Sequence, residues 1–283
     1  MPIPADLQTR EQFTAAYDNL SVIADADSVV AALRERSRAF HAAHDCIADV
    51  PYGPGPRQVY DWYPARAEDP ASAPVLVFIH GGYWQARDKR DFCCVGTGPL
   101  AAGLHLVMAE YTLAPQASLP DMVAEIGRLL DGLSTHPVLG GQAGRPRRLV
   151  LSGHSAGAHL AAMHRAHAEV AGVLAISGLF DLEPIRRGAL NDALGLDPAQ
   201  VAQCSPQFLV GPGAPTVVAV GGAELSELQR QSREYADALN GAGQITHLLE
   251  LAGANHLSIL AELESREGIL LAEALALVER ARR

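Results

Sequence analysis

Residues 149–157 read Leu-Val-Leu-Ser-Gly-His-Ser-Ala-Gly, and they are the strongest indication of the fold. An apolar strand pattern runs into Gly153, and a helical pattern begins after Gly157. In such a G-x-S-x-G turn a side chain at either glycine would meet neighbouring backbone, and the strain lifts the Ser155 hydroxyl clear of the sheet. The stretch therefore predicts a nucleophilic serine on a strand–turn–helix unit. A chance Gly/Ser turn is the alternative, which the flanking strand and helix patterns disfavour.

Short apolar runs alternate with helical patterns along the rest of the chain. Several runs are continuous in Val, Leu and Ile, which is typical of strands buried on both faces of a parallel sheet. The expected strands are 57–63, 74–80, 104–111, 148–153, 172–177, 215–221 and 246–251, and the expected helices are 10–45, 118–133, 155–168, 226–240 and 257–280. This alternation predicts an α/β fold with a doubly wound, mostly parallel sheet. Residues 181–213 break the rhythm, so we expect a small cap insertion within a single domain spanning 1–283.

Composition and charge limit the partners and the location. The chain has 283 residues and a formal net charge of −10, which suits one large α/β domain and repels nucleic acid and anionic membranes. We therefore expect a small-molecule substrate, no nucleic acid and no membrane partner, while a homodimer is left open. Neither an apolar run of ~18 residues nor a secretory signal is present, so the expected location is cytoplasmic. The 4 cysteines fit no metal-binding spacing, and we expect free thiols and no metal.

A second signal follows the apolar strand 75–79. Residues 80–84 read His-Gly-Gly-Tyr-Trp, and glycines in this place let backbone N–H groups point into a cavity. Such donors stabilise the oxyanion of a tetrahedral intermediate by ~3 kcal/mol each. The N–H of Ala156, the residue after the nucleophile, would add a further donor. The alternative is an ordinary strand-end turn, and His80 fits a structural residue that fixes the loop.

A nucleophilic serine needs a base, and His256 fits best among the 11 histidines. It follows the last expected strand in a Gly-Ala-Asn-His loop, and it comes last in chain order, as this arrangement of catalytic residues requires. His154 and His159 lie beside the serine in sequence, on the wrong side of the turn. His164 and His167 fall on the following helical pattern, where a solvated face is expected.

The acid that orients the base must lie between the serine and His256 in the sequence. Glu224 follows the strand 215–221, and Asp181 follows the strand 172–177. We favour Glu224 because the acid usually follows the penultimate strand, which leaves Asp181 as a turn or cap residue. Glu227 is a weaker third candidate, since it falls inside a helical pattern.

Four segments together resemble the kynurenine formamidases (arylformamidases), a family of α/β-hydrolases near the hormone-sensitive-lipase-like esterases. They are residues 80–84, 153–160, 177–184 and 230–234, and the resemblance runs from about residue 10 to about residue 265. It implies an α/β-hydrolase fold and a triad of Ser155, the acid at position 224 and His256. It also implies an oxyanion hole formed by the backbone of Gly82 and Tyr83 together with Ala156. The segment 223–227 reads Ala-Glu-Leu-Ser-Glu, whereas the family usually carries Asp in a His-Asp-Ser-Pro-Glu-like segment.

The resemblance implies hydrolysis of a small acyl amide, with N-formyl-L-kynurenine giving kynurenine and formate through an acyl-enzyme. No metal or organic cofactor is expected. Gly81, Tyr83 and Trp84 would contact the substrate, with core packing as the alternative for Trp84. A short-chain carboxylesterase or amidase would use the same residues, so it remains an alternative. A non-catalytic binding protein on the same fold is a more remote one.

Overall fold

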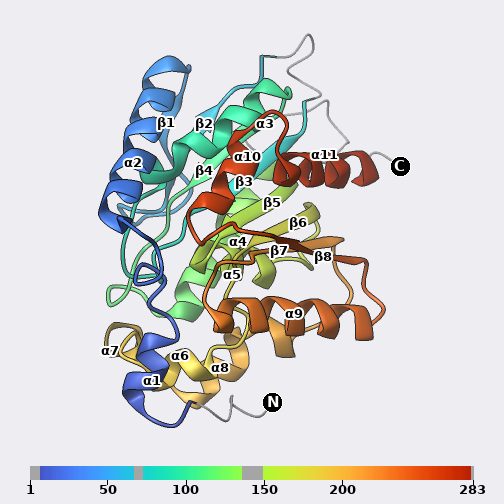
Figure 1. Ribbon diagram of the computed structural model, residues 1–283. Helices are drawn as coiled ribbons and strands as arrows, with labels where there is room; N and C mark the ends of the chain where they lie inside the picture. Colours follow the sequence, from blue (N-terminus) through green and yellow to red (C-terminus); the bar gives the residue numbers. More distant parts are fainter. Residues whose placement is uncertain (1–6, 67–72, 136–148, 282–283) are drawn as a thin grey trace.

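An eight-stranded sheet forms the centre of the molecule (Figure 1). The structure is a computed structural model that describes residues 7–66, 73–135 and 149–281. The strands are β1 (Ile47–Pro51), β2 (Val59–Tyr63), β3 (Val75–Ile79), β4 (His105–Ala109), β5 (Leu149–His154), β6 (Val170–Ile176), β7 (Thr216–Gly221) and β8 (Thr246–Leu251). They lie in the order β1-β2-β4-β3-β5-β6-β7-β8, parallel from β4 to β8, whereas β2 is antiparallel to both β1 and β4. The predicted doubly wound, mostly parallel α/β sheet is confirmed.

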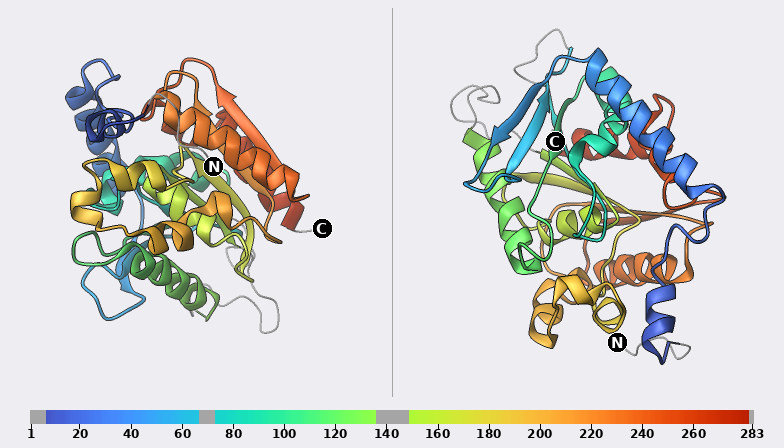
Figure 2. Two further views of the ribbon diagram at one scale, coloured as in Figure 1. Left: turned by 90° about the horizontal axis from the view of Figure 1, so that it is seen from below. Right: turned by 90° about the vertical axis from the view of Figure 1, so that its left-hand side faces the viewer.

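Helices cover both faces of the sheet (Figure 2). The side chains of β3 alternate between two hydrophobic clusters, with Val77 in one and Phe78 in the other. The first cluster packs against α4 (Leu119–Thr135), α5 (Ala156–Met163) and α9 (Ser226–Gly241), and the second against α2 (Ala26–Ala43), the 3-10 helix η2 (Lys89–Gly96) and α11 (Ile269–Ala281). Burial on both faces is the physical reason that the central strands are continuous apolar runs in the sequence.

Several helix boundaries differ from the sequence-based expectation. The pattern at 10–45 forms two helices, α1 (Arg10–Ala15) and α2, and the pattern at 257–280 forms η4 (Ser258–Leu260), α10 (Ala261–Glu264) and α11. At the second break a Cβ on Gly268 would lie 2.0 Å from the carbonyl oxygen of Glu262, so the chain turns too tightly there for a continuous helix. Strand β1, η2 and α3 (Thr97–Ala101) were not expected.

The segment 181–213 carries α6 (Glu183–Arg187), α7 (Asn191–Leu194), α8 (Pro198–Cys204) and η3 (Pro206–Phe208). In Figure 1 the three α-helices lie beside α1 at the bottom of the molecule. The N–H of Ala189 donates to the hydroxyl of Thr14 at 3.0 Å, and Arg10 pairs with Asp192 at 2.5 Å, so α1 is tied to this segment. Its function as a cap stays a prediction.

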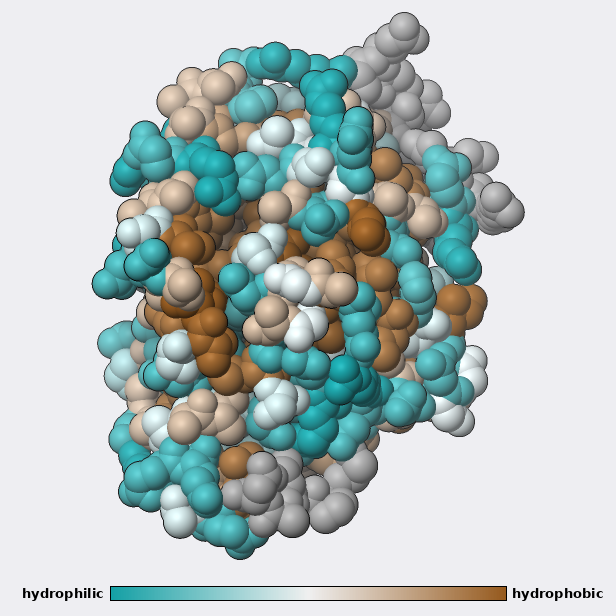
Figure 3. Space-filling model, in the orientation of Figure 1, coloured by the Kyte–Doolittle hydropathy of each residue, from teal (hydrophilic) through white to brown (hydrophobic). Residues whose placement is uncertain are grey.

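Among the described residues no helix is both long and apolar enough to cross a membrane. All four cysteines are free thiols. Hydrophobic surface appears on the left, in the centre and on the right of the face shown in Figure 3, interleaved with hydrophilic side chains. The segment between α1 and α2 contributes two exposed apolar side chains, Leu20 and Val22.

Candidate active site

Ser155 lies on the sharp turn between β5 and α5, with φ 56° and ψ −119°. Residues other than glycine rarely adopt a positive φ, so the backbone of this turn is strained and the surrounding packing must hold it in place. A Cβ at Gly157 would lie 2.0 Å from the carbonyl oxygen of Ile79, and one at Gly153 would lie 2.2 Å from the carbonyl oxygen of Gly157. The two glycines therefore allow α5 to approach β3 closely enough to form the turn.

His256 and Glu224 are in direct contact. Nδ1 of His256 lies 2.6 Å from Oε2 of Glu224, and both residues are buried. The other carboxylate oxygen, Oε1, accepts a hydrogen bond from the hydroxyl of Ser177 at 2.6 Å and from the N–H of Gly221 at 2.7 Å. Because a carboxylate is acceptor-only, it fixes a proton on Nδ1 of His256 and leaves Nε2 as the nitrogen that can take a proton.

His256 lies beside the turn that carries Ser155. Nε2 of His154, the residue before the serine, lies 2.7 Å from the carbonyl oxygen of His256. The rings of His154 and His256 are 4.5 Å apart between centroids. The loop after β8 and the turn after β5 therefore meet in the same region of the molecule.

Neither of the other two candidate acids contacts His256. Oδ1 of Asp181 accepts a hydrogen bond from the N–H of Glu183 at 3.0 Å, so this side chain terminates a turn at the start of α6. Glu227 is paired with Arg230 at 2.8 Å and accepts a hydrogen bond from the hydroxyl of Tyr17 at 3.1 Å. Both carboxylates thus bind partners within the fold.

The loop after β3 has three consecutive residues with positive φ: Gly82 at 114°, Tyr83 at 52° and Trp84 at 59°. A Cβ at Gly81 would lie 3.1 Å from the Cβ of Ser155, so this loop runs directly against the serine. Within the described part of the chain, no backbone hydrogen bond is made by the N–H groups of Gly82, Tyr83 or Ala156. An oxyanion hole formed by these three donors stays a prediction.

His80 anchors the base of that loop. Its Nε2 lies 2.9 Å from Oε1 of Glu110, and its Nδ1 lies 2.7 Å from the carbonyl oxygen of Gly81. Burial by itself would raise the pKa of the Glu110 carboxyl. Hydrogen bonds and cationic neighbours outweigh burial and lower this pKa to about 2. His80 is fully buried and stacks on Tyr111 with ring centroids 4.6 Å apart, so it has a structural position.

The structure favours the core-packing alternative for Trp84, and its substrate contact stays a prediction. The positive φ values of the loop turn its indole into the core, where it is fully buried and meets His159 edge to face at 5.0 Å. Tyr83 donates a hydrogen bond to the carbonyl oxygen of Tyr17 and accepts one from Nδ2 of Asn19 at 2.6 Å. Its ring is thus tied to the N-terminal segment, and substrate contacts of Gly81 and Tyr83 stay predictions.

The expected solvated face for His164 and His167 is corrected. Helix α5 ends at Met163, so both residues lie beyond it. Nε2 of His164 lies 2.8 Å from the carbonyl oxygen of Val123, and burial lowers the pKa of His164 to about 4. His167 contacts Asp131 at 3.1 Å.

Sequence reasoning missed Ser177, which donates to Glu224. This serine directly follows β6, is fully buried and has φ 53°, a second strained backbone position close to the site. Two sequence signals mark it: the Ser-Gly pair directly after an apolar strand, which is common in ordinary turns, and its place at the start of the segment 177–184 that carries the family resemblance. Its function depends on a partner 47 residues away in the chain.

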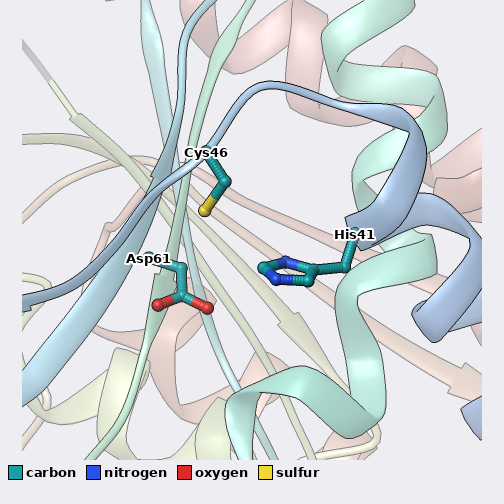
Figure 4. A group of neighbouring side chains, drawn as sticks. All are labelled: His41, Cys46 and Asp61. Atoms are coloured by element: carbon teal, nitrogen blue, oxygen red, sulfur yellow. The ribbon is translucent and has the colours of Figure 1, made fainter.

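Among the described residues, one group of side chains has the types of ligand atom that bind metal ions. Ligand atoms of His41, Cys46 and Asp61 lie within 4.8 Å of one another (Figure 4). However, Asp61 is already paired with Arg90 at 3.1 Å and with Lys89 at 3.4 Å, and burial raises the pKa of the Cys46 thiol to about 11. A divalent cation would meet two positive charges and a protonated thiol, so the surroundings of this group do not suit a metal ion.

Known proteins similar to this chain include formamidases and esterases. A family model described as BD-FAE matches residues 61–181. The kynurenine formamidase of Danio rerio is 28% identical to this chain, and the alignment covers 85% of each of the two chains. The kynurenine formamidase of Salmo salar is also 28% identical, and the alignment covers 83% of each chain. A candidate thioesterase from Silicibacter sp. TM1040 superposes with a TM-score of 0.82 at 24% identity, covering 92% of this chain and 97% of its own. Esterase B from Lactobacillus rhamnosis superposes with a TM-score of 0.69 at 18% identity, covering 92% of this chain and 97% of its own.

The fold and the site together define the class. The chain is an α/β-hydrolase, and it is a hydrolytic enzyme. Within that class its resemblance to the kynurenine formamidases, near the hormone-sensitive-lipase-like esterases, is confirmed.

Proposed function

We propose that the protein hydrolyses a small acyl amide through a Ser155–His256–Glu224 triad, and that N-formyl-L-kynurenine is its substrate. The observation that carries the proposal is the 2.6 Å contact between Nδ1 of His256 and Oε2 of Glu224, beside the strained turn of Ser155. Similarity to the Danio rerio kynurenine formamidase over 85% of both chains supports the choice of substrate.

The first half of the reaction forms an acyl-enzyme. Nε2 of His256 takes the proton of Ser155 as Oγ attacks the formyl carbon, and Glu224 stabilises the imidazolium that results. The carbonyl oxygen becomes an oxyanion, which the N–H groups of Gly82, Tyr83 and Ala156 bind. His256 then gives its proton to the arylamine nitrogen, the C–N bond breaks, and kynurenine leaves.

The second half returns the enzyme to its starting state. His256 takes a proton from water, whose oxygen attacks the formyl ester of Ser155. The same oxyanion donors bind the second tetrahedral intermediate. His256 then protonates Oγ of Ser155, and formate is released. Every proton passes through one imidazole, so the proposed reaction uses neither a metal nor an organic cofactor.

The chemistry of the substrate suits this site. A formyl group is small enough for a buried serine, which is only 2% exposed. An arylamine is a better leaving group than an alkylamine, so the apparatus of an esterase is sufficient to break this amide.

Replacing Ser155 by Ala tests the proposal. We expect formate release from N-formyl-L-kynurenine to fall by about 10³-fold or more, because the nucleophile is absent. Ser152→Ala is a matched control, since Ser152 is a buried serine on β5 whose hydroxyl donates only to the carbonyl oxygen of Leu174 at 3.1 Å. A Ser155→Ala variant that still cleaves an aryl formamide and an aryl ester at near wild-type rates would end the hypothesis.

A short-chain carboxylesterase is the second candidate function. Esterases are prominent among the structural neighbours, and a rice protein described as a probable isoprenylcysteine alpha-carbonyl methylesterase is 34% identical over 118 residues. The ratio of kcat/KM for N-formyl-L-kynurenine to that for a p-nitrophenyl ester separates the two functions. Failure to react with a fluorophosphonate probe would instead favour a non-catalytic binding protein. The small-molecule substrate, the homodimer and the cytoplasmic location stay predictions.

A further inference from the structure

His154 contacts His256 without belonging to the proposed triad. Its Nε2 lies 2.7 Å from the carbonyl oxygen of His256, and the two ring centroids are 4.5 Å apart with an interplanar angle of 44°. A carbonyl oxygen only accepts hydrogen bonds, so Nε2 of His154 must carry the proton. The contact therefore fixes the tautomer of His154.

The surroundings of His154 keep its ring neutral. The residue is only 2% exposed, and a Cβ at Gly81 would lie 3.2 Å from its Nδ1. The ring also lies 6.1 Å from the ring of Phe92, and within the described residues Nδ1 has no hydrogen-bond partner. Burial and the neighbouring His256 lower the pKa of His154 well below its ordinary value.

A neutral ring in this place matters because His256 gains a positive charge during the proposed reaction. A second cation at 4.5 Å would oppose that charge, since buried like charges repel strongly. A neutral imidazole can lie against the charged ring at no such cost. The Nε2–H group of His154 also donates a hydrogen bond to the backbone carbonyl oxygen of His256, while Glu224 binds the His256 side chain at Nδ1. The catalytic imidazole is thus fixed at two points.

We propose that His154 is a positioning residue for His256: its Nε2–H binds the carbonyl oxygen of His256, and its neutral ring packs against the imidazole that moves the proton. The inference rests on the proposed triad of Ser155, His256 and Glu224. It gives the residue before the nucleophile a function in orienting the base, in addition to its place in the turn.

His159 provides a matched control within the same region. It is fully buried, burial lowers its pKa to about 4, and its Nε2 lies 2.7 Å from a carbonyl oxygen. Within the described residues its Nδ1 also has no hydrogen-bond partner. The carbonyl belongs to Cys204 in α8, however, so His159 does not hold His256. Equivalent substitutions at 154 and 159 therefore separate positioning of the base from loss of a buried histidine.

The experiment compares Leu and Gln at both positions in the full-length protein. Leu removes the donor at similar volume, whereas the side-chain amide of Gln places an N–H near the position of Nε2. We expect His154→Leu to lower kcat for p-nitrophenyl acetate and the rate of fluorophosphonate labelling by about 10- to 100-fold, with KM changed less than about 2-fold. His154→Gln should keep both rates within about 5-fold of wild type, and both His159 variants should keep kcat within about 3-fold.

A second readout follows His256 directly. The proton shared by Nδ1 of His256 and Glu224 gives a strongly downfield resonance in the proton NMR spectrum, which should broaden or disappear in His154→Leu and persist in His159→Leu. If His154→Leu fails to fold, the rates and the NMR spectrum of His154→Gln still test the proposal.

The proposal is overturned if His154→Leu keeps the kcat of His159→Leu, or if His154→Gln loses as much activity as His154→Leu. Ser155→Ala separates this failure from that of the proposed function. An inactive Ser155→Ala protein beside an unaffected His154→Leu protein removes only the positioning function. An active Ser155→Ala protein removes the triad on which it rests.

Discussion

At the scale of single residues, Glu224 is held by three hydrogen bonds from three different parts of the chain. The donors are the hydroxyl of Ser177 directly after β6, the N–H of Gly221 at the end of β7 and Nδ1 of His256 after β8. A buried carboxylate needs such partners, because an unpaired charge in the interior is very costly. The proposed acid therefore lies where the loops after three neighbouring strands meet.

Substitution of the two candidate acids distinguishes their functions. We expect Glu224→Gln to lower kcat by about 10²- to 10⁴-fold, because a neutral amide cannot stabilise the imidazolium of His256. Asp181→Asn should keep kcat within about 3-fold, since that side chain only caps a turn at α6. Steady-state kinetics on an aryl formamide and an aryl ester provide the measurement. An inactive Asp181→Asn protein beside an active Glu224→Gln protein would reassign the acid.

At the scale of elements, the approach of α5 to β3 determines whether the serine turn can form. The position of Gly157 is so close to β3 that a Cβ would meet the carbonyl oxygens of Ile79 and His80 at 2.0 and 2.7 Å. Both contacts are with backbone, which cannot move aside as a side chain can. The helix would have to shift away from the sheet and carry Ser155 with it.

Two Gly→Ala substitutions, one where the Cβ would meet backbone and one where it would not, measure how closely α5 must approach β3. We expect Gly157→Ala to lower the free energy of unfolding by about 3 kcal/mol or more, because overpacking against backbone forces the elements apart. Gly241→Ala at the end of α9 should instead raise it by about 0.5–1 kcal/mol, since among the described residues a Cβ there meets nothing within 4 Å and alanine favours a helix. Urea unfolding of both variants gives the two values. A Gly157→Ala protein as stable as wild type would show that α5 can shift without cost.

At the scale of the whole molecule, buried histidines make the fold sensitive to acid. Burial lowers the pKa of both His159 and His164 from 6.5 to about 4. Between these two pH values the unfolded chain binds protons at both residues and the native protein does not. Their contribution to stability is therefore complete above pH 6.5 and is lost as the pH falls toward 4.

The pH dependence of stability tests this conclusion. Gln at position 159 keeps an N–H donor but does not titrate. We expect the free energy of unfolding of wild type, relative to His159→Gln, to fall by about 1 kcal/mol per pH unit between about pH 6.5 and 4. Above pH 7 the difference should be constant. Chemical unfolding at a series of pH values measures it, and parallel curves over the whole range would show that His159 titrates normally.

Local sequence patterns were enough to predict the sheet, the serine turn and the group of loops from which a site could be built. Continuous apolar runs predict strands buried on both faces, and two glycines around Ser155 predict a close helix–strand contact, because both signals are local and follow from sterics and burial. The chain order of serine, acid and histidine reduced the candidates for the base to His256 and the leading candidates for the acid to Glu224 and Asp181.

Features that depend on contacts between distant segments became visible only in the packed fold. It joined Ser177 and His154 to the site through partners 47 and 102 residues away, and it turned Trp84 into the core, where the sequence had suggested a substrate contact. It also divided the helical patterns at 10–45 and 257–280, because periodicity records which face is apolar and not where the chain must turn. Side-chain direction and long-range hydrogen bonds arise only when the strands and helices pack, so the local sequence carries no record of them.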